Sequence, residues 1–144
     1  MSRTILVTGG AGYIGSHATL ALLAAGWRVI VLDNLVTGFA WAVPGGAKFV
    51  HGDIADQALL AELLETEQIF AIMHFAGSVV VPESVRDPLK YYENNTAKSR
   101  SLIESAVRGK VRHFIFSSTA ATYGIPLAIP VDERAPTVPI NPYG

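Results

Sequence analysis

Three glycines at three-residue spacing lie early in the chain, and this pattern is typical of a phosphate-binding turn. Gly9, Gly12 and Gly15 occur in "TGGAGYIGSH", between a short β-branched run at residues 4–8 and an apolar, helix-like run at residues 13–25. Small residues are needed where a backbone turns sharply and approaches a phosphate. The N-terminus of the following helix then adds free N–H groups and a partial positive charge. Because loops are often rich in glycine, the triplet needs support from other residues.

An acidic residue at the end of the next apolar run gives that support. Asp33 closes the run at 28–33 and follows Gly9 by 24 residues, a spacing at which a carboxylate accepts both hydroxyls of an adenosine ribose. The same carboxylate would repel a 2′-phosphate, and residues 34–40 contain no Arg or Lys to receive one. The sequence therefore favours NAD over NADP as the dinucleotide.

A second acidic residue follows the third strand-like run. Asp53 could accept a hydrogen bond from the exocyclic amine of adenine while Ile54 packs on the ring. The alternative is that Asp53 is only the N-cap of the helix expected to follow. The sequence leaves both interpretations open.

Strand-like and helix-like runs alternate along the chain. We expect strands at 4–8, 28–33, 47–53, 69–77 and 111–118, and helices at 13–25, 56–67 and 87–109. Continuously apolar strands separated by helices indicate a parallel sheet covered on both faces. The predicted fold is an α/β, doubly wound parallel sheet of the Rossmann type over residues 1–124. Residues 125–144 hold five of the eight prolines and are expected to lead towards a substrate domain that this chain lacks.

Composition excludes several classes of protein. The 144 residues carry 11 basic and 12 acidic side chains, so no positive surface for nucleic acid or an anionic membrane is expected. The chain has no cysteine, no signal peptide and no apolar run long enough to span a membrane, so we expect a soluble, cytoplasmic protein. The four histidines share no metal-ligand spacing.

Six segments in order resemble the extended branch of the short-chain dehydrogenases/reductases, and specifically the UDP-glucose 4-epimerase family. The segments are "VTGGAGYIGSH", "LDNL", "GDI", "HFAG…ESV.DPL.YY.NN", "FSSTAATYG" and "NPYG". The resemblance covers essentially the whole chain. It implies an NAD-dependent isomerase of nucleotide-sugar and galactose metabolism, which interconverts UDP-glucose and UDP-galactose by C4 oxidation and re-reduction through a 4-keto intermediate.

The resemblance also implies which residues contact the cofactor. Besides the three glycines, it assigns this role to Tyr13, Ile14, Asp33, Asn34, Asp53, Ile54, Phe75, Ala76, Gly77 and Asn94. One position departs from the family pattern. Well-known members have a lysine two residues after the F-A-G triplet, and here that residue is Val79. One charged contact to the cofactor is therefore in question.

The catalytic and substrate-binding residues implied by the resemblance are Tyr143 and Thr119. Tyr143 matches the base of a Y-x-x-x-K motif, and Thr119 matches a hydroxyl that bonds the C4 oxygen of the sugar. Related dehydratases have Asp-Glu directly after that position, whereas this chain has Ala120 and Ala121, which favours an epimerase. Lys98 is expected on a solvated helix face and not as a substitute for the motif's lysine.

The chain stops three residues before the position of that lysine, so we expect an N-terminal portion that is inactive alone. Two alternatives stay open: an NAD-binding module without catalysis, and a 4-epimerase of another UDP-sugar, a uronate or a pentose. The resemblance further implies a homodimer for the full-length enzyme, formed through the helix at 87–108 together with the helix that carries the motif's lysine. With only one of these two helices, this chain is expected to associate weakly.

Overall fold

The computed structural model describes residues 3–144. These residues form two compact units, which we call unit 1 and unit 2. Unit 1 contains the chain up to Gly77 together with Lys98–Ser117, and unit 2 contains Ser78–Ala97 and Ser118–Gly144. The boundary expected after Gly124 for the whole protein stays a prediction.

Unit 1 is built on a five-stranded sheet in which every paired strand is parallel. Its strands follow the order β3-β2-β1-β4-β5, the order of the first half of a Rossmann sheet with its extension past the switch point. The strands are β1 (Thr4–Thr8), β2 (Arg28–Asp33), β3 (Lys48–His51), β4 (Ile69–His74) and β5 (His113–Phe116). The predicted fold class is confirmed, with the last three strands shorter than expected.

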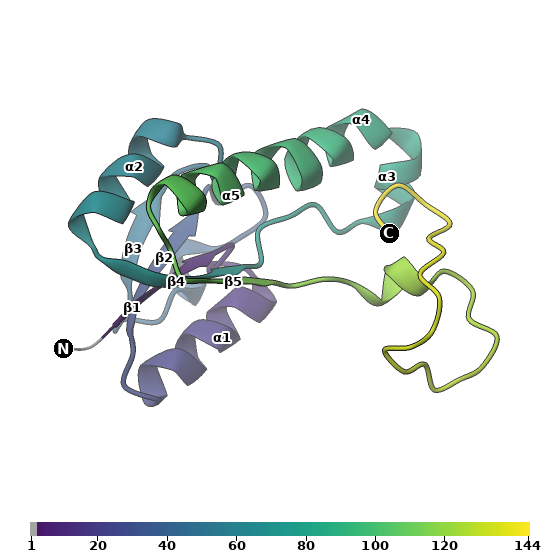
Figure 1. The fold of residues 1–144 in the computed structure, drawn as a ribbon, viewed down its shortest axis with the longest axis horizontal. Helices are drawn as coiled ribbons and strands as arrows, with labels where there is room; N and C mark the ends of the chain where they lie inside the picture. The colour runs from purple at the N-terminus through teal and green to yellow at the C-terminus, as the bar shows by residue number, and fades with distance from the viewer. Residues whose placement is uncertain (1–2) are drawn as a thin grey trace. The chain divides into compact units, whose positions relative to one another are not determined.

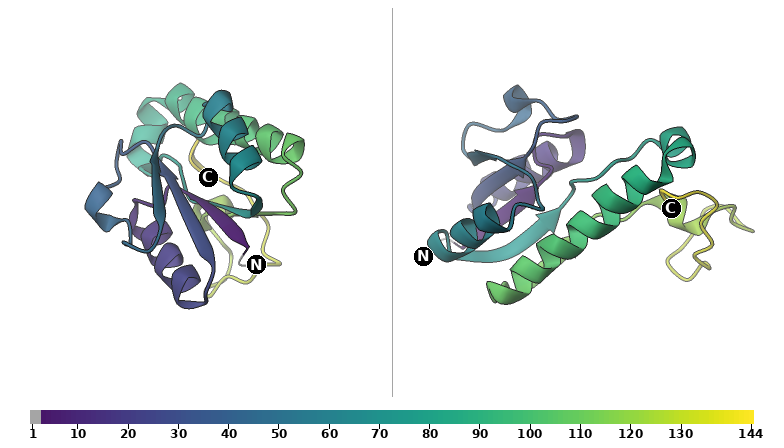
Figure 2. Two further views of the ribbon diagram at one scale, coloured as in Figure 1. Left: turned by 90° about the vertical axis from the view of Figure 1, so that its left-hand side faces the viewer. Right: turned by 90° about the horizontal axis from the view of Figure 1, so that it is seen from above.

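Helices cover both faces of this sheet. Figures 1 and 2 show α1 on one face and α2 with α5 on the other. Their bounds are Tyr13–Ala24 for α1, Gln57–Thr66 for α2 and Lys98–Arg108 for α5, and a short 3-10 turn, η1, spans Ala40–Ala42. None of the helices within residues 3–144 is long and apolar enough to cross a membrane.

The alternation of side chains along each strand explains the two layers of helices. Leu6 of β1 packs in one cluster with Leu60 of α2 and Leu102 of α5. Val7, the next residue, belongs to a second cluster, against which Leu22 and Leu23 of α1 pack. Each central strand thus buries apolar side chains on both faces, as its continuous apolar sequence requires.

Unit 2 contains short helices and irregular chain. Its elements are α3 (Val81–Arg86), α4 (Pro88–Tyr91), η2 (Tyr92–Ala97) and η3 (Ala120–Tyr123). The long helix predicted over 87–109 begins as expected, because the Asp87 side chain accepts a hydrogen bond from the Lys90 N–H. It is not uniformly α-helical, because η2 is a π-helical segment between α4 and α5. Helix α3 was not predicted.

Candidate dinucleotide-binding site

The glycine loop follows β1 and leads into α1 in unit 1. Gly9 has a φ of +71°, and a Cβ there would lie 2.5 Å from the backbone nitrogen of Ala76. A Cβ on Gly15 would overlap the carbonyl oxygen of Gly9. These two glycines are therefore required by the packing of the loop itself.

Gly12 differs from its two partners in the triplet. A Cβ there would meet only the Gly9 carbonyl oxygen, at 3.3 Å, and its φ is not positive. Packing alone therefore constrains this position weakly, which fits a residue kept small for something outside the chain. Gly10, which the sequence analysis did not single out, is tightly constrained, because a Cβ there would lie 2.6 Å from Cγ1 of Val31.

The N-terminus of α1 is a potential anion site. Gly12 is the N-cap residue, and within residues 3–144 no side chain caps the helix. The first turn therefore keeps N–H groups and a partial positive charge available to a ligand. Tyr13 and Ile14, both predicted cofactor contacts, are exposed there, Tyr13 to 82%.

Asp33 connects the glycine loop to the loop after β2. Its Oδ2 accepts a hydrogen bond from the Ala11 N–H at 2.9 Å, and its Oδ1 accepts one from the Leu35 N–H at 2.8 Å. The carbonyl oxygen of Ala11 accepts in turn from the Phe39 N–H at 3.0 Å. A carboxylate offers about four lone-pair sites, so about two remain after these bonds. The contact of Asp33 with a ribose stays a prediction.

Asn34, Asp53 and Lys98 form one polar network. Oδ2 of Asp53 accepts from the amide of Asn34 at 3.0 Å and from the ammonium of Lys98 at 2.7 Å, while Oδ1 accepts from the Ala55 N–H at 2.9 Å. Burial raises the pKa of Asp53, but the hydrogen bonds from Lys98, Ala55 and Asn34 outweigh it and hold the pKa below its ordinary value.

Two expectations about this region need correction. The N-cap of α2 is Asp56, whose side chain accepts from the N–H groups of Ala58 and Leu59, and not Asp53. Lys98 does not lie on a solvated face, because its ammonium pairs with Asp53. Ile54 is 7% exposed and packs in the core cluster, and its contact with adenine stays a prediction.

The chain after β4 passes beside the glycine loop. The Phe75 N–H donates to the carbonyl oxygen of Thr8 at 2.9 Å, and Phe75 and Ala76 pack against the two core clusters. At the end of β4, the His74 imidazole lies between the hydroxyls of Thr8 and Ser99, at 2.6 Å and 2.8 Å. Burial lowers the pKa of His74 to about 4.

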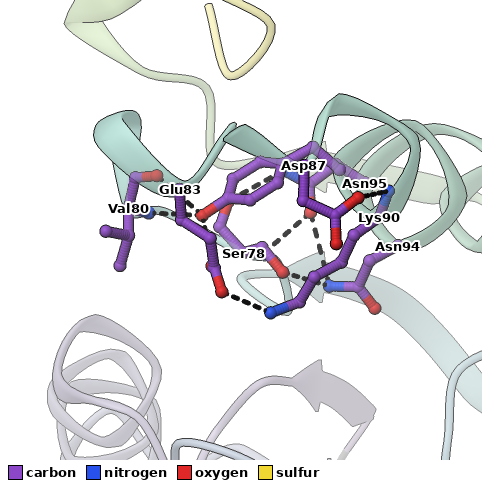
Figure 3. A network of polar contacts seen from close by, with 8 residues as sticks. Ser78, Val80, Glu83, Asp87, Lys90, Asn94 and Asn95 are labelled. Carbon is purple, nitrogen blue, oxygen red and sulfur yellow. Dashed lines mark hydrogen bonds and ion pairs between the residues drawn. The ribbon is translucent and has the colours of Figure 1, made fainter. Parts of the chain in front are cut away.

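Unit 2 holds the predicted contact Asn94. Its side-chain amide donates to the hydroxyl of Ser78 at 3.0 Å. The neighbouring Asn95, which the sequence analysis did not select, accepts from the Ser78 N–H at 2.7 Å and donates to its carbonyl oxygen at 2.8 Å. Figure 3 shows both asparagines beside Ser78. The repeated "NN" was the only available signal, and it does not distinguish a residue that fixes a loop from one that binds a ligand.

A second group of contacts in unit 2 surrounds the phenol of Tyr91, which is 1% exposed. Its hydroxyl accepts from the Val80 N–H at 2.9 Å and lies 2.9 Å from Glu83. Lys90 pairs with the other oxygen of Glu83 (Figure 3). The hydrogen bond from Lys90 lowers the pKa of Glu83, and burial raises the pKa of Tyr91.

The predicted catalytic residues both belong to unit 2. Thr119 is the N-cap of η3, and its hydroxyl accepts from the Ala121 N–H at 3.2 Å. The ring of Tyr143 meets the ring of Tyr91 edge-on, with 6.4 Å between the centroids. A Cβ on Gly144 would lie 2.5 Å from the carbonyl oxygen of Ala121, so the segment that carries Tyr143 packs against η3.

Known proteins with similar sequences and structures match this chain over nearly its whole length. A UDP-glucose 4-epimerase of Azospirillum brasilense is 51% identical over 99% of this chain, which covers 41% of that relative. A probable UDP-arabinose 4-epimerase of Arabidopsis thaliana is 46% identical over 97% of the chain and is covered to 36%. A solved structure of UDP-glucose 4-epimerase from Brucella ovis in complex with NAD superposes with a TM-score of 0.94, at 46% identity, over 99% of this chain and 43% of that one.

The chain thus spans less than half the length of these relatives. The sequence pattern of the family of NAD dependent epimerases/dehydratases matches residues 5–144, which is nearly the whole chain. The glycine loop, Asp33 and the "NPYG" segment all lie within the matched residues. The chain belongs to the NAD dependent epimerase/dehydratase family.

Proposed function

We propose that residues 3–144 form the NAD-binding part of a UDP-sugar 4-epimerase and carry its catalytic tyrosine. The observation that carries the proposal is the arrangement of Asp33, the glycine loop and the uncapped N-terminus of α1. In this arrangement the Asp33 carboxylate, which can accept from ribose hydroxyls, lies next to the free N–H groups of α1, which can donate to a pyrophosphate. The 51% identity to a UDP-glucose 4-epimerase supports the same assignment.

The residues present fit a dinucleotide. The smallness of Gly12 allows a pyrophosphate to approach the first N–H groups of α1. Asp33 and Asn34 would hold the adenosine ribose and Asp53 the adenine amine, while Phe75, Ala76, Gly77 and Asn94 remain proposed contacts. When bound, NAD supplies the removal and return of hydride at C4 of the sugar.

The proposed chemistry needs one base and one hydroxyl from this chain. Tyr143 would take the proton of the C4 hydroxyl, and Thr119 would hold the C4 oxygen by a hydrogen bond. Ala120 and Ala121 provide no acid or base for eliminating water, which favours epimerisation over dehydration. We propose UDP-glucose and UDP-galactose as substrates. A UDP-pentose is the second candidate, supported by the similarity to a probable UDP-arabinose 4-epimerase.

Cofactor binding is the first test. Calorimetric titration of the 144-residue chain should show NAD binding well ahead of NADP, because Asp33 repels a 2′-phosphate. Replacing Asp33 with Ser and Asn34 with Arg should narrow or invert this preference. Equal affinity of the parent chain for both dinucleotides would contradict the assignment of Asp33.

Turnover is the second test, and it requires the length that the relatives have. Residues 1–144 joined to the remainder of the Azospirillum brasilense enzyme should convert UDP-galactose to UDP-glucose in a coupled dehydrogenase assay. Tyr143→Phe in this chimera should abolish most of the turnover, since the base is lost. Tyr92→Phe, which removes the hydroxyl of an exposed tyrosine, is the matched control. Full activity of the Tyr143 variant would show that another residue is the base.

A further inference from the structure

Lys98 joins three segments of unit 1 that are distant in sequence. Its ammonium, at the start of α5, lies 2.7 Å from Oδ2 of Asp53, which follows β3. The same oxygen accepts from Asn34, which follows β2. The loops after β2 and β3 are thereby tied to α5 at the carboxyl edge of the sheet, where ligands of open α/β sheets bind.

This ion pair differs from the others among residues 3–144. Its lysine side chain is 25% exposed, whereas the cations of the other pairs are 50% to 76% exposed. Exposed pairs contribute little because water screens them and their side chains lose rotational freedom. A partly buried pair whose carboxylate receives two further hydrogen bonds is held in a more defined geometry.

The network leaves Asp53 as an acceptor with little freedom. Three donors, from Lys98, Asn34 and Ala55, occupy three of its roughly four lone-pair sites. The remaining site belongs to Oδ1, because Oδ2 already accepts twice. An ionised acceptor with one open site pairs with an N–H group and repels a carbonyl oxygen.

We propose that Lys98 is a positioning residue of the adenine subsite, and that it fixes Asp53 so that this carboxylate selects a purine with an exocyclic amine. The inference rests on the proposed function, since Asp53 is the residue assigned to the adenine. Lys98 acts through Asp53 and needs no contact with the ligand itself. Its loss would leave Asp53 with two neutral donors and a wider range of orientations.

The test compares NAD with nicotinamide hypoxanthine dinucleotide, which has a carbonyl oxygen in place of the adenine amine. The parent chain should bind NAD at least about tenfold more tightly, the usual effect of one hydrogen bond to a charged group. Lys98→Met should reduce this ratio to about two- or threefold, and Lys98→Arg should restore it because a guanidinium also pairs with a carboxylate. The ratio does not depend on the fraction of folded protein, since unfolding lowers both apparent affinities equally.

Lys48→Met is the matched control, because it also removes a lysine–carboxylate pair, with Glu67, at the opposite end of β3. Its ratio should equal that of the parent chain. If Lys98→Met keeps the parent ratio, or Lys48→Met loses it equally, the role of Lys98 is overturned while the proposed function stands. If the parent chain binds neither dinucleotide, the proposed function fails and the inference fails with it.

Discussion

At the scale of single residues, the glycine loop contains positions that its own packing requires and one that packing constrains only weakly. Gly9, Gly10 and Gly15 leave no space for a Cβ, since their nearest neighbours lie well inside van der Waals distance. Gly12 has a neighbour at 3.3 Å and no positive φ. A motif that looks uniform in sequence therefore contains two kinds of glycine.

This difference predicts a separation of stability from affinity. Gly15→Ala should lower the free energy of unfolding by about 1–3 kcal/mol in urea titrations, because the methyl group overlaps the Gly9 carbonyl oxygen. Gly12→Ala should cost much less stability but weaken NAD binding, because its methyl group would lie on the path by which we propose that the pyrophosphate approaches. Gly45→Ala, with no atom within 4 Å of the new Cβ, should change neither. An unaltered NAD affinity in Gly12→Ala would argue against a pyrophosphate at this loop.

At the scale of elements, His74 connects β1, β4 and α5 through the hydroxyls of Thr8 and Ser99. Burial holds its pKa at about 4, against an ordinary value of 6.5. The folded chain therefore keeps a neutral imidazole between about pH 4 and 6.5, where the unfolded chain binds a proton. The contribution of His74 to folding stability is therefore present above pH 6.5 and is lost progressively as the pH falls towards 4.

The expected loss between pH 7 and pH 5 is about 2 kcal/mol from this residue, given 1.36 kcal/mol for each pKa unit. Urea unfolding of the parent chain and of His74→Gln at both pH values measures it. The Gln variant should show a correspondingly smaller difference between the two pH values. His113→Gln, which removes an exposed histidine, is the matched control for the loss of an imidazole. A parallel pH dependence in parent and His74→Gln would rule out this role.

Elements near the glycine loop were the most predictable from sequence, and contacts between distant segments the least. The ends of β1, α1 and β2 were correct to within one residue, because continuous apolar runs and flanking glycines define them. Helix α3 was missed because "VVVPESV" is rich in β-branched residues, which do not indicate a helix. The pairing of Lys98 with Asp53 joins residues 45 positions apart, and no local pattern encodes it.

At the scale of the whole molecule, α5 has an inner and an outer face. Leu102 and Ala106 are buried in the core, whereas Ile103 and Val107 are exposed to 46% and 71%. The two exposed residues are four positions apart and so lie on one side of the helix. A homodimer of the full-length enzyme stays a prediction, and it would use this face, where Ile103 and Val107 are exposed apolar residues.

We therefore expect the 144-residue chain to associate weakly and reversibly, with an average mass in sedimentation equilibrium that rises with concentration. Val107→Glu should keep the chain monomeric at concentrations where the parent associates, because a charge would have to be buried or paired at the contact. Its melting temperature should change little, since the residue is exposed in the single chain. Leu20→Glu is the matched control, because it places the same charge at an exposed apolar position of α1, on the opposite face of the sheet. Association that survives Val107→Glu but disappears in Leu20→Glu would assign the interface to α1. A tight dimer in every variant would require a contact larger than the outer face of α5 provides.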